Sequence, residues 1–198
     1  MLSSFKEEVQ RILKTQAKIA NNIGMTPNKI SLIGITLAVF SSFSYLKWQS
    51  NNFYLLLAPV LLLISGFCDV LDGALARTYN KVTIFGGFLD SLLDRYSEVF
   101  VLIGIIVSGL CVVIWGLIAV VGSLLVSYSR ARAEITGVKM ESIGLAERAE
   151  RILILTIFSF VAYFYQPKTT MNVGIIIIAI LSHITVLQRT WHIYNKLK

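Results

Sequence analysis

Long apolar runs impose the strongest constraint on how this chain can fold. A transmembrane helix needs about 20 predominantly apolar residues, and inside a bilayer only helices and closed barrels satisfy their own backbone. Helical runs of this kind are predicted at about residues 28–48, 53–78, 84–109, 111–136, 147–165 and 171–190. The 198-residue chain is 56% hydrophobic, with a mean hydropathy of +0.72. We therefore expect an all-α integral membrane bundle of six transmembrane helices, in which residues 1–198 form a single domain.

The N-terminal stretch, residues 3–22, has a different pattern. Its apolar residues recur at helical spacing opposite lysine and arginine side chains. Ser4 followed by Glu7 has the spacing of a capping box at a helix start. This pattern predicts an amphipathic helix that lies in the membrane interface. Because acids and bases interrupt it, the stretch lacks the apolar core of a cleaved signal peptide, so we expect insertion to begin with the first transmembrane helix.

Four aspartates interrupt the second and third apolar runs. Asp69 and Asp72 are spaced i,i+3 and Asp90 and Asp94 i,i+4, so each pair projects from one face of its helix. Antiparallel helices would bring the four carboxylates together. A charged side chain at the centre of a bilayer costs about 2.5–3.5 kcal/mol on insertion scales, so the carboxylates need a positive partner. Since hard cations prefer oxygen ligands, we predict that these aspartates bind Mg²⁺, with Mn²⁺ as an alternative. The site would hold one ion or, as we expect, two.

Charge and cysteine content exclude other classes of protein. The formal net charge of +7 comes with no nucleic-acid motif, and basic cytoplasmic loops account for it. Cys68 and Cys111 lack paired spacing, so we expect neither a disulfide nor a zinc site. Of the 18 Lys and Arg residues, only Lys47 and Lys168 fall on the side opposite the aspartates. The positive-inside rule therefore predicts a cell-membrane protein whose active site and two termini face the cytoplasm.

The aspartates are part of a longer pattern, D-x2-D-G-x2-A-R-x8-G-x3-D-x3-D, and residues 69–94 fill every fixed position of it. This pattern resembles the signature of the CDP-alcohol phosphotransferase family, which are integral membrane enzymes that make phospholipid head groups. The resemblance implies metal-dependent transfer of a phosphatidyl-type group, diacyl or archaeal diether, from a CDP-linked lipid to an alcohol, with release of CMP. It also implies that Asp94 is the catalytic base and that Asp69, Asp72 and Asp90 are metal ligands.

Six residues are predicted to contact the cytidine nucleotide of the donor. They are Thr26, Pro27, Asn28, Gly73, Arg77 and Thr83. The first three match a family element of the nucleotide site, but a capping threonine followed by a proline in the first helical turn explains them equally well. The other three are implied by the family resemblance.

Five arginines on the same membrane side form a candidate site for an acceptor phosphate. They are Arg130, Arg132, Arg148, Arg151 and Arg189. Guanidinium groups bind phosphate through paired hydrogen bonds, although topological bias and local pairing with glutamates would also place them there. Residues 127–134 and 144–151 resemble the phosphatidylinositol-phosphate and archaetidylinositol-phosphate synthases. That resemblance implies inositol phosphate as the acceptor, held by Arg130, Arg151 and Arg189, although the bacterial branch has lysine in place of Arg130 and proline in place of Ala149.

Three alternatives stay open at this level. The same chemistry with glycerol 3-phosphate is one, and serine is another, although serine has no phosphate for the arginines. A divalent-cation transporter would need polar residues along a route to both faces, whereas the charges here stop at one end of the helices. Glu98 lies one turn beyond Asp94 and either supports the site or pairs with a base such as Arg95.

The predicted partners are the CDP-lipid, the phosphorylated alcohol, membrane lipids and a second copy of the chain. The family resemblance implies a homodimer. Small residues on the third and fourth apolar runs offer surfaces for close helix packing in such a dimer. They are Gly104, Gly109, Gly116 and Gly122.

Overall fold

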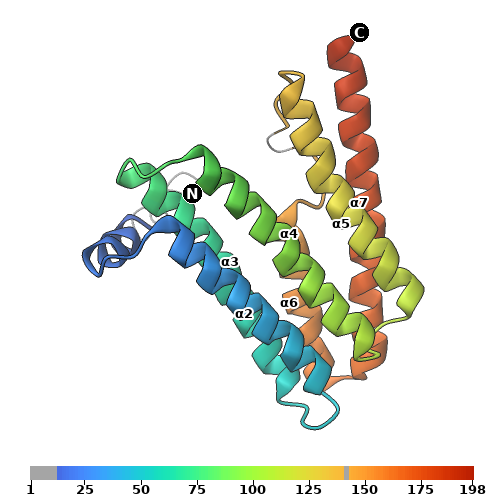
Figure 1. Cartoon of the computed structure of the whole chain (residues 1–198). Coiled ribbons are helices and arrows are strands. Elements are labelled where there is room, and N and C mark those ends of the chain that lie inside the picture. Colours follow the sequence, from blue (N-terminus) through green and yellow to red (C-terminus); the bar gives the residue numbers. More distant parts are fainter. Residues whose placement is uncertain (1–12, 141–142) are drawn as a thin grey trace, which may run out of the picture.

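The structure is a computed structural model that describes residues 13–140 and 143–198. Within these residues every regular element is a helix (Figure 1). After a helical segment over residues 13–22, the chain forms α2 (Pro27–Lys47), α3 (Tyr54–Thr78), α4 (Ile84–Val107), α5 (Val113–Ile135), α6 (Arg148–Phe164) and α7 (Pro167–Leu197). The all-α class is confirmed for the described part of the chain.

Four helices, α2, α3, α5 and α7, are long and apolar enough to cross a membrane. α4 carries several charged side chains along its first half, and α6 has only 17 residues. The structure therefore supports a membrane protein with four candidate spans. The predicted number of six transmembrane helices stays a prediction. Residues 3–12 of the predicted amphipathic helix, with Ser4 and Glu7, lie outside the described residues.

Local capping explains where the helices near the aspartates begin. The Thr26 side chain accepts a hydrogen bond from the Lys29 N–H at 3.4 Å, with Pro27 in the first turn of α2. Thr83 caps α4 in the same way, because its Oγ1 accepts from the Gly86 N–H at 2.9 Å. A short turn connects α3 to α4, and therefore the end of α3 and the start of α4 lie next to each other.

The helices pack in two groups, which are joined by α6 and by a contact between α4 and α5. α2, α3 and α4 pack together, α5 packs against α7, and α6 contacts both α3 and α7 (Figure 1). A buried apolar cluster that includes Tyr45, Leu102 and Ile175 runs through these contacts. The ends of α3 and α4 that carry the aspartates lie beside the start of α6, which brings two sets of predicted site residues together.

Three of the four glycines expected on a dimer surface pack inside the chain instead. A Cβ on Gly104 would come within 2.7 Å of the Ser42 carbonyl oxygen on α2, and one on Gly122 within 2.8 Å of His183 on α7. Gly116 is also buried, against Ile106. These glycines allow helices of the same chain to approach closely, so they do not indicate where a second copy would bind.

Candidate functional site

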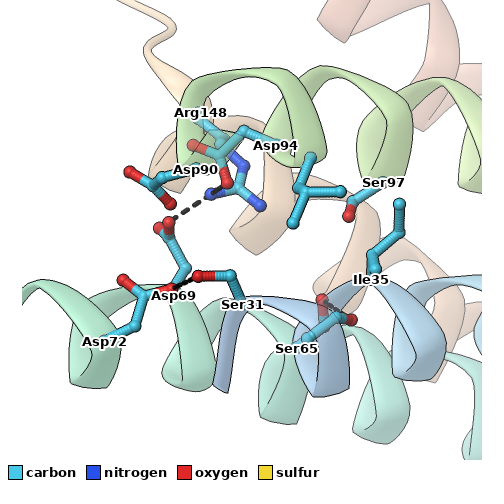
Figure 2. A pocket seen from close by; sticks show the side chains of 11 residues that line it. Ser31, Ile35, Ser65, Asp69, Asp72, Asp90, Asp94, Ser97 and Arg148 are labelled. Carbon is cyan, nitrogen blue, oxygen red and sulfur yellow. Dashed lines mark hydrogen bonds and ion pairs between the residues drawn. The ribbon is translucent and has the colours of Figure 1, made fainter. Parts of the chain in front are cut away.

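The four aspartates meet where α3 and α4 face each other, as Figure 2 shows. Asp69 and Asp72 come from α3, and Asp90 and Asp94 come from α4. One carboxylate oxygen from each of Asp69, Asp72 and Asp90 lies within 4.8 Å of the other two. All four aspartates line one small cavity. Three of the four aspartates that were predicted to bind metal thus lie close together, and the fourth, Asp94, lines the same cavity.

This donor set fits a divalent metal ion. Carboxylate oxygens from two helices are the ligands that Mg²⁺ and Mn²⁺ prefer. Asp72 is buried, and its neighbours are half-buried, so their mutual repulsion is poorly screened by water. A cation at this point would remove that repulsion. The residues that would hold it are Asp69, Asp72 and Asp90.

Asp94 is held by an arginine from α6. One terminal nitrogen of Arg148, Nη1, lies 2.6 Å from Asp94 Oδ1 and 2.7 Å from Asp69 Oδ2. Figure 2 shows this guanidinium among the carboxylates. Its Nε is buried and makes no hydrogen bond within the described part of the chain. Arg148 was predicted to bind the acceptor phosphate, and the structure places it directly against the aspartate cluster.

Sequence reasoning missed Ser31. This residue lies on α2, where its hydroxyl donates a hydrogen bond to Asp72 Oδ2. It also lines the aspartate cavity, as seen in Figure 2. Ser31 follows Asn28 by three residues and Pro27 by four, so it lies on the same helix face as these predicted nucleotide residues. That spacing could have identified Ser31 as a site residue.

A cavity of about 300 Å³ lies between the start of α2, the end of α3 and the start of α4. Asp72 and Asp90 form part of its wall. Five of the six predicted nucleotide residues line it, namely Pro27, Asn28, Gly73, Arg77 and Thr83. Thr26 is absent from this lining and caps α2 instead. Gly86 also lines this cavity, and a side chain does not fit there because a Cβ would come within 2.8 Å of the Thr83 hydroxyl oxygen that caps α4.

A second cavity, of about 560 Å³, is lined by the other two aspartates, Asp69 and Asp94. Four of the five predicted acceptor arginines line it, namely Arg130, Arg148, Arg151 and Arg189. The fifth, Arg132, is exposed and does not take part in the lining. Arg130 forms a 3.0 Å ion pair with Glu134 at the exposed end of α5. We call this space the arginine cavity.

Arg151 is 1% exposed and is held by a paired interaction with Glu98. Its Nε and Nη2 lie 2.5 Å and 2.8 Å from the two carboxylate oxygens of Glu98. The sequence left open whether Glu98 supports the site or pairs with Arg95. In the structure Glu98 binds and orients Arg151, and so it supports the arginine cavity. Arg95 instead donates a hydrogen bond to the Ser91 carbonyl oxygen.

Arg189 is also 1% exposed, and three acceptors surround its guanidinium group. Nη2 lies 2.8 Å from Glu147, Nε donates to the Ile143 carbonyl oxygen at 2.8 Å, and Nη1 donates to the Val126 carbonyl oxygen at 2.6 Å. Both buried arginines therefore have fixed positions in the cavity wall. Their charges are each paired with one glutamate.

Comparison with known proteins is consistent with this geometry. Residues 24–187 match the family model for CDP-alcohol phosphatidyltransferase. The chain is 39% identical over 200 residues to an archaetidylinositol phosphate synthase of Pyrococcus horikoshii, covering 100% of this chain and 99% of the relative. Among solved structures, the phosphatidylinositol phosphate synthase of Mycobacterium tuberculosis with CDP-DAG bound is similar, with a TM-score of 0.78 and 29% identity over 93% of this chain and 94% of that one.

A second structure of the Mycobacterium tuberculosis enzyme, in complex with manganese and citrate, has a TM-score of 0.77 and 29% identity. The structural match covers 92% of this chain and 88% of the Mycobacterium tuberculosis chain. The family model and the full-length similarity to the Pyrococcus horikoshii relative agree with the aspartate pattern in the sequence. The chain therefore belongs to the CDP-alcohol phosphatidyltransferase family of enzymes.

Proposed function

We propose that this enzyme transfers a phosphatidyl-type phosphate group from a CDP-linked lipid to a hydroxyl of inositol phosphate and releases CMP. The observation that carries the proposal is the pair of cavities that adjoin one aspartate cluster. Asp72 and Asp90 line the cavity with the predicted nucleotide residues, and Asp69 and Asp94 line the arginine cavity. A donor in the first cavity and a phosphorylated acceptor in the second would meet at the carboxylates.

The acceptor follows from the arginine cavity and the relatives. Inositol phosphate carries a phosphate dianion that Arg130, Arg151 and Arg189 can bind through charge-assisted hydrogen bonds. The relatives are named as archaetidylinositol phosphate and phosphatidylinositol phosphate synthases, which supports the same choice. Either a diether or a diacyl lipid is compatible with this chemistry. The site and both termini are proposed to face the cytoplasm.

Asp69, Asp72 and Asp90 are proposed to hold Mg²⁺ or Mn²⁺, as two ions. When bound, the metal would neutralise the charge of the donor diphosphate and would stabilise the leaving phosphate. Asp94 lies at the boundary of the arginine cavity, where it would take the proton of the acceptor hydroxyl. The acceptor oxygen then bonds to the lipid-bearing phosphorus, the bond from that phosphorus to the bridging oxygen breaks, and CMP departs. Arg148 keeps Asp94 and Asp69 adjacent.

Release of CMP with a panel of acceptors tests the proposal. Purified protein in detergent, with Mg²⁺ and a CDP-lipid of either linkage, should release CMP with inositol phosphate and not with free inositol. The reason is that only inositol phosphate supplies a dianion for the arginines. Glycerol 3-phosphate and serine serve as the competing acceptors. Equal CMP release with free inositol or serine would contradict the assignment of the arginine cavity to an acceptor phosphate.

We also propose a twofold homodimer, on the basis of the family resemblance. Because Gly104, Gly116 and Gly122 pack within the chain, the interface must use other residues. Light scattering of the detergent-solubilised protein, corrected for detergent, should give about twice the chain mass of 22.1 kDa. A monomeric mass in a sample with full transferase activity would show that the reaction needs no partner subunit.

A further inference from the structure

The two buried arginines of the arginine cavity depend on one short segment, residues 143–147, which leads into α6. The segment offers them three hydrogen-bond acceptors, namely the carbonyl oxygens of Ile143 and Ala146 and the carboxylate of Glu147. Arg189 takes the first and the third, each at 2.8 Å, and Arg151 takes the second at 2.7 Å. The position of the segment therefore helps to set the position of both guanidinium groups.

A single buried hydroxyl group fixes this segment. Thr185 of α7 is fully buried, and its Oγ1 accepts hydrogen bonds from the backbone N–H of Leu145 at 3.1 Å and of Ala146 at 3.0 Å. The preceding Gly144 has a φ of +128°, a region that favours glycine, and a Cβ there would come within 2.3 Å of Thr185 Cγ2. The segment thus lies directly against this threonine.

Thr185 and Arg189 are spaced i,i+4, so they occupy the same face of α7 one turn apart. That face therefore provides both the hydroxyl that holds the segment and the guanidinium that the segment orients. If the Oγ1 acceptor is lost, two N–H groups lose their partner, and the buried N–H of Ala146 cannot turn to water. For the two N–H groups to find other hydrogen-bond partners, residues 143–147 would have to move. The three acceptors that bind Arg151 and Arg189 would move with them.

We propose that Thr185 is a positioning residue for the acceptor half of the reaction. It holds residues 143–147 in place, and these residues orient Arg151 and Arg189 toward the acceptor phosphate. The inference rests on the proposed function for what the arginines bind. The hydrogen bonds of Thr185 to the segment stand independently of that function and can be measured separately.

Thr185→Val and Thr185→Ser form a matched pair for the test, because valine has nearly the same shape without the acceptor and serine keeps the acceptor. In full-length protein with Mg²⁺, Thr185→Val should raise the KM for inositol phosphate about tenfold. The KM for the CDP-lipid should change by less than about twofold, because the nucleotide cavity is lined by other elements. Thr185→Ser should restore the acceptor KM to within about threefold of wild type.

Hydrogen exchange supplies a readout that needs no substrate. Amides of residues 143–147 should exchange about tenfold faster in Thr185→Val than in wild type, and Thr185→Ser should keep them protected. If Thr185→Val does not accumulate in the membrane, Thr185→Ala removes the same acceptor and fits the same space.

Two results would overturn the inference: unchanged exchange in the variant that lacks the hydroxyl, or an equal rise in both KM values that serine does not rescue. A wild-type enzyme that releases no CMP with inositol phosphate would instead refute the proposed function. The exchange comparison would then still decide whether Thr185 holds the segment.

Discussion

Asp90→Asn should reduce CMP release by roughly a thousandfold, or about 4 kcal/mol of transition-state stabilisation. The neutral amide is similar in size to the carboxylate but is a poorer ligand for a divalent cation. Asp90 contributes one of the three oxygens that lie within 4.8 Å of one another. It is a better choice than Asp69, because Asp69 also forms an ion pair with Arg148 and its loss would disturb two contacts.

The metal itself should be measured beside the activity. Binding of Mn²⁺ to purified protein, followed by electron paramagnetic resonance or calorimetry, should weaken in Asp90→Asn to the same extent that transfer is lost. Glu134→Gln is the control for Mn²⁺ binding alone, since it neutralises a carboxylate outside the aspartate cluster. It does not serve as a control for transfer, because Glu134 is paired with Arg130. Full transfer in excess chelator, or unchanged Mn²⁺ affinity in Asp90→Asn, would rule out the metal mechanism.

Helix positions and the aspartate cluster could be predicted because both depend on short-range periodicity. Apolar runs place α2 to α6 within about two residues of their observed bounds, and α3 agrees at its last residue. α7 was predicted too short, at 171–190. Pro167 is accommodated in its first turn, and the polar residues after Arg189 continue the helix without an apolar pattern.

Contacts between distant helices could not be read from the sequence. The sequence predicts that Arg148 and Arg151 lie on the same membrane side, but it does not show that Arg148 contacts Asp94 and Arg151 contacts Glu98. Both contacts join the start of α6 to α4, which precedes it by about 50 residues, and no local pattern encodes them. The same holds for Thr185, whose two hydrogen bonds join residues about 40 positions apart.

Arg151→Ala should lower kcat/KM for inositol phosphate by roughly 2 kcal/mol or more, about thirtyfold, mainly through the acceptor KM. The KM for the CDP-lipid should change little. Arg77→Ala should show the reverse pattern, because Arg77 lines the nucleotide cavity. Arg132→Ala is the matched control, since that arginine is exposed and does not line the arginine cavity. Steady-state kinetics with each substrate varied in turn would measure all three variants.

Loss of Arg151 also leaves the carboxylate of Glu98 without its paired partner, and breaking a buried ion pair costs about 3–5 kcal/mol of folding stability. A second variant separates this stability effect from acceptor binding. Arg151→Ala combined with Glu98→Gln removes the unpaired charge, so the thermal unfolding temperature should rise above that of Arg151→Ala alone. The acceptor KM should stay high, because the guanidinium is still missing. If the acceptor KM recovers together with the unfolding temperature, Arg151 serves only to hold α6 against α4, and the acceptor phosphate is bound by other arginines.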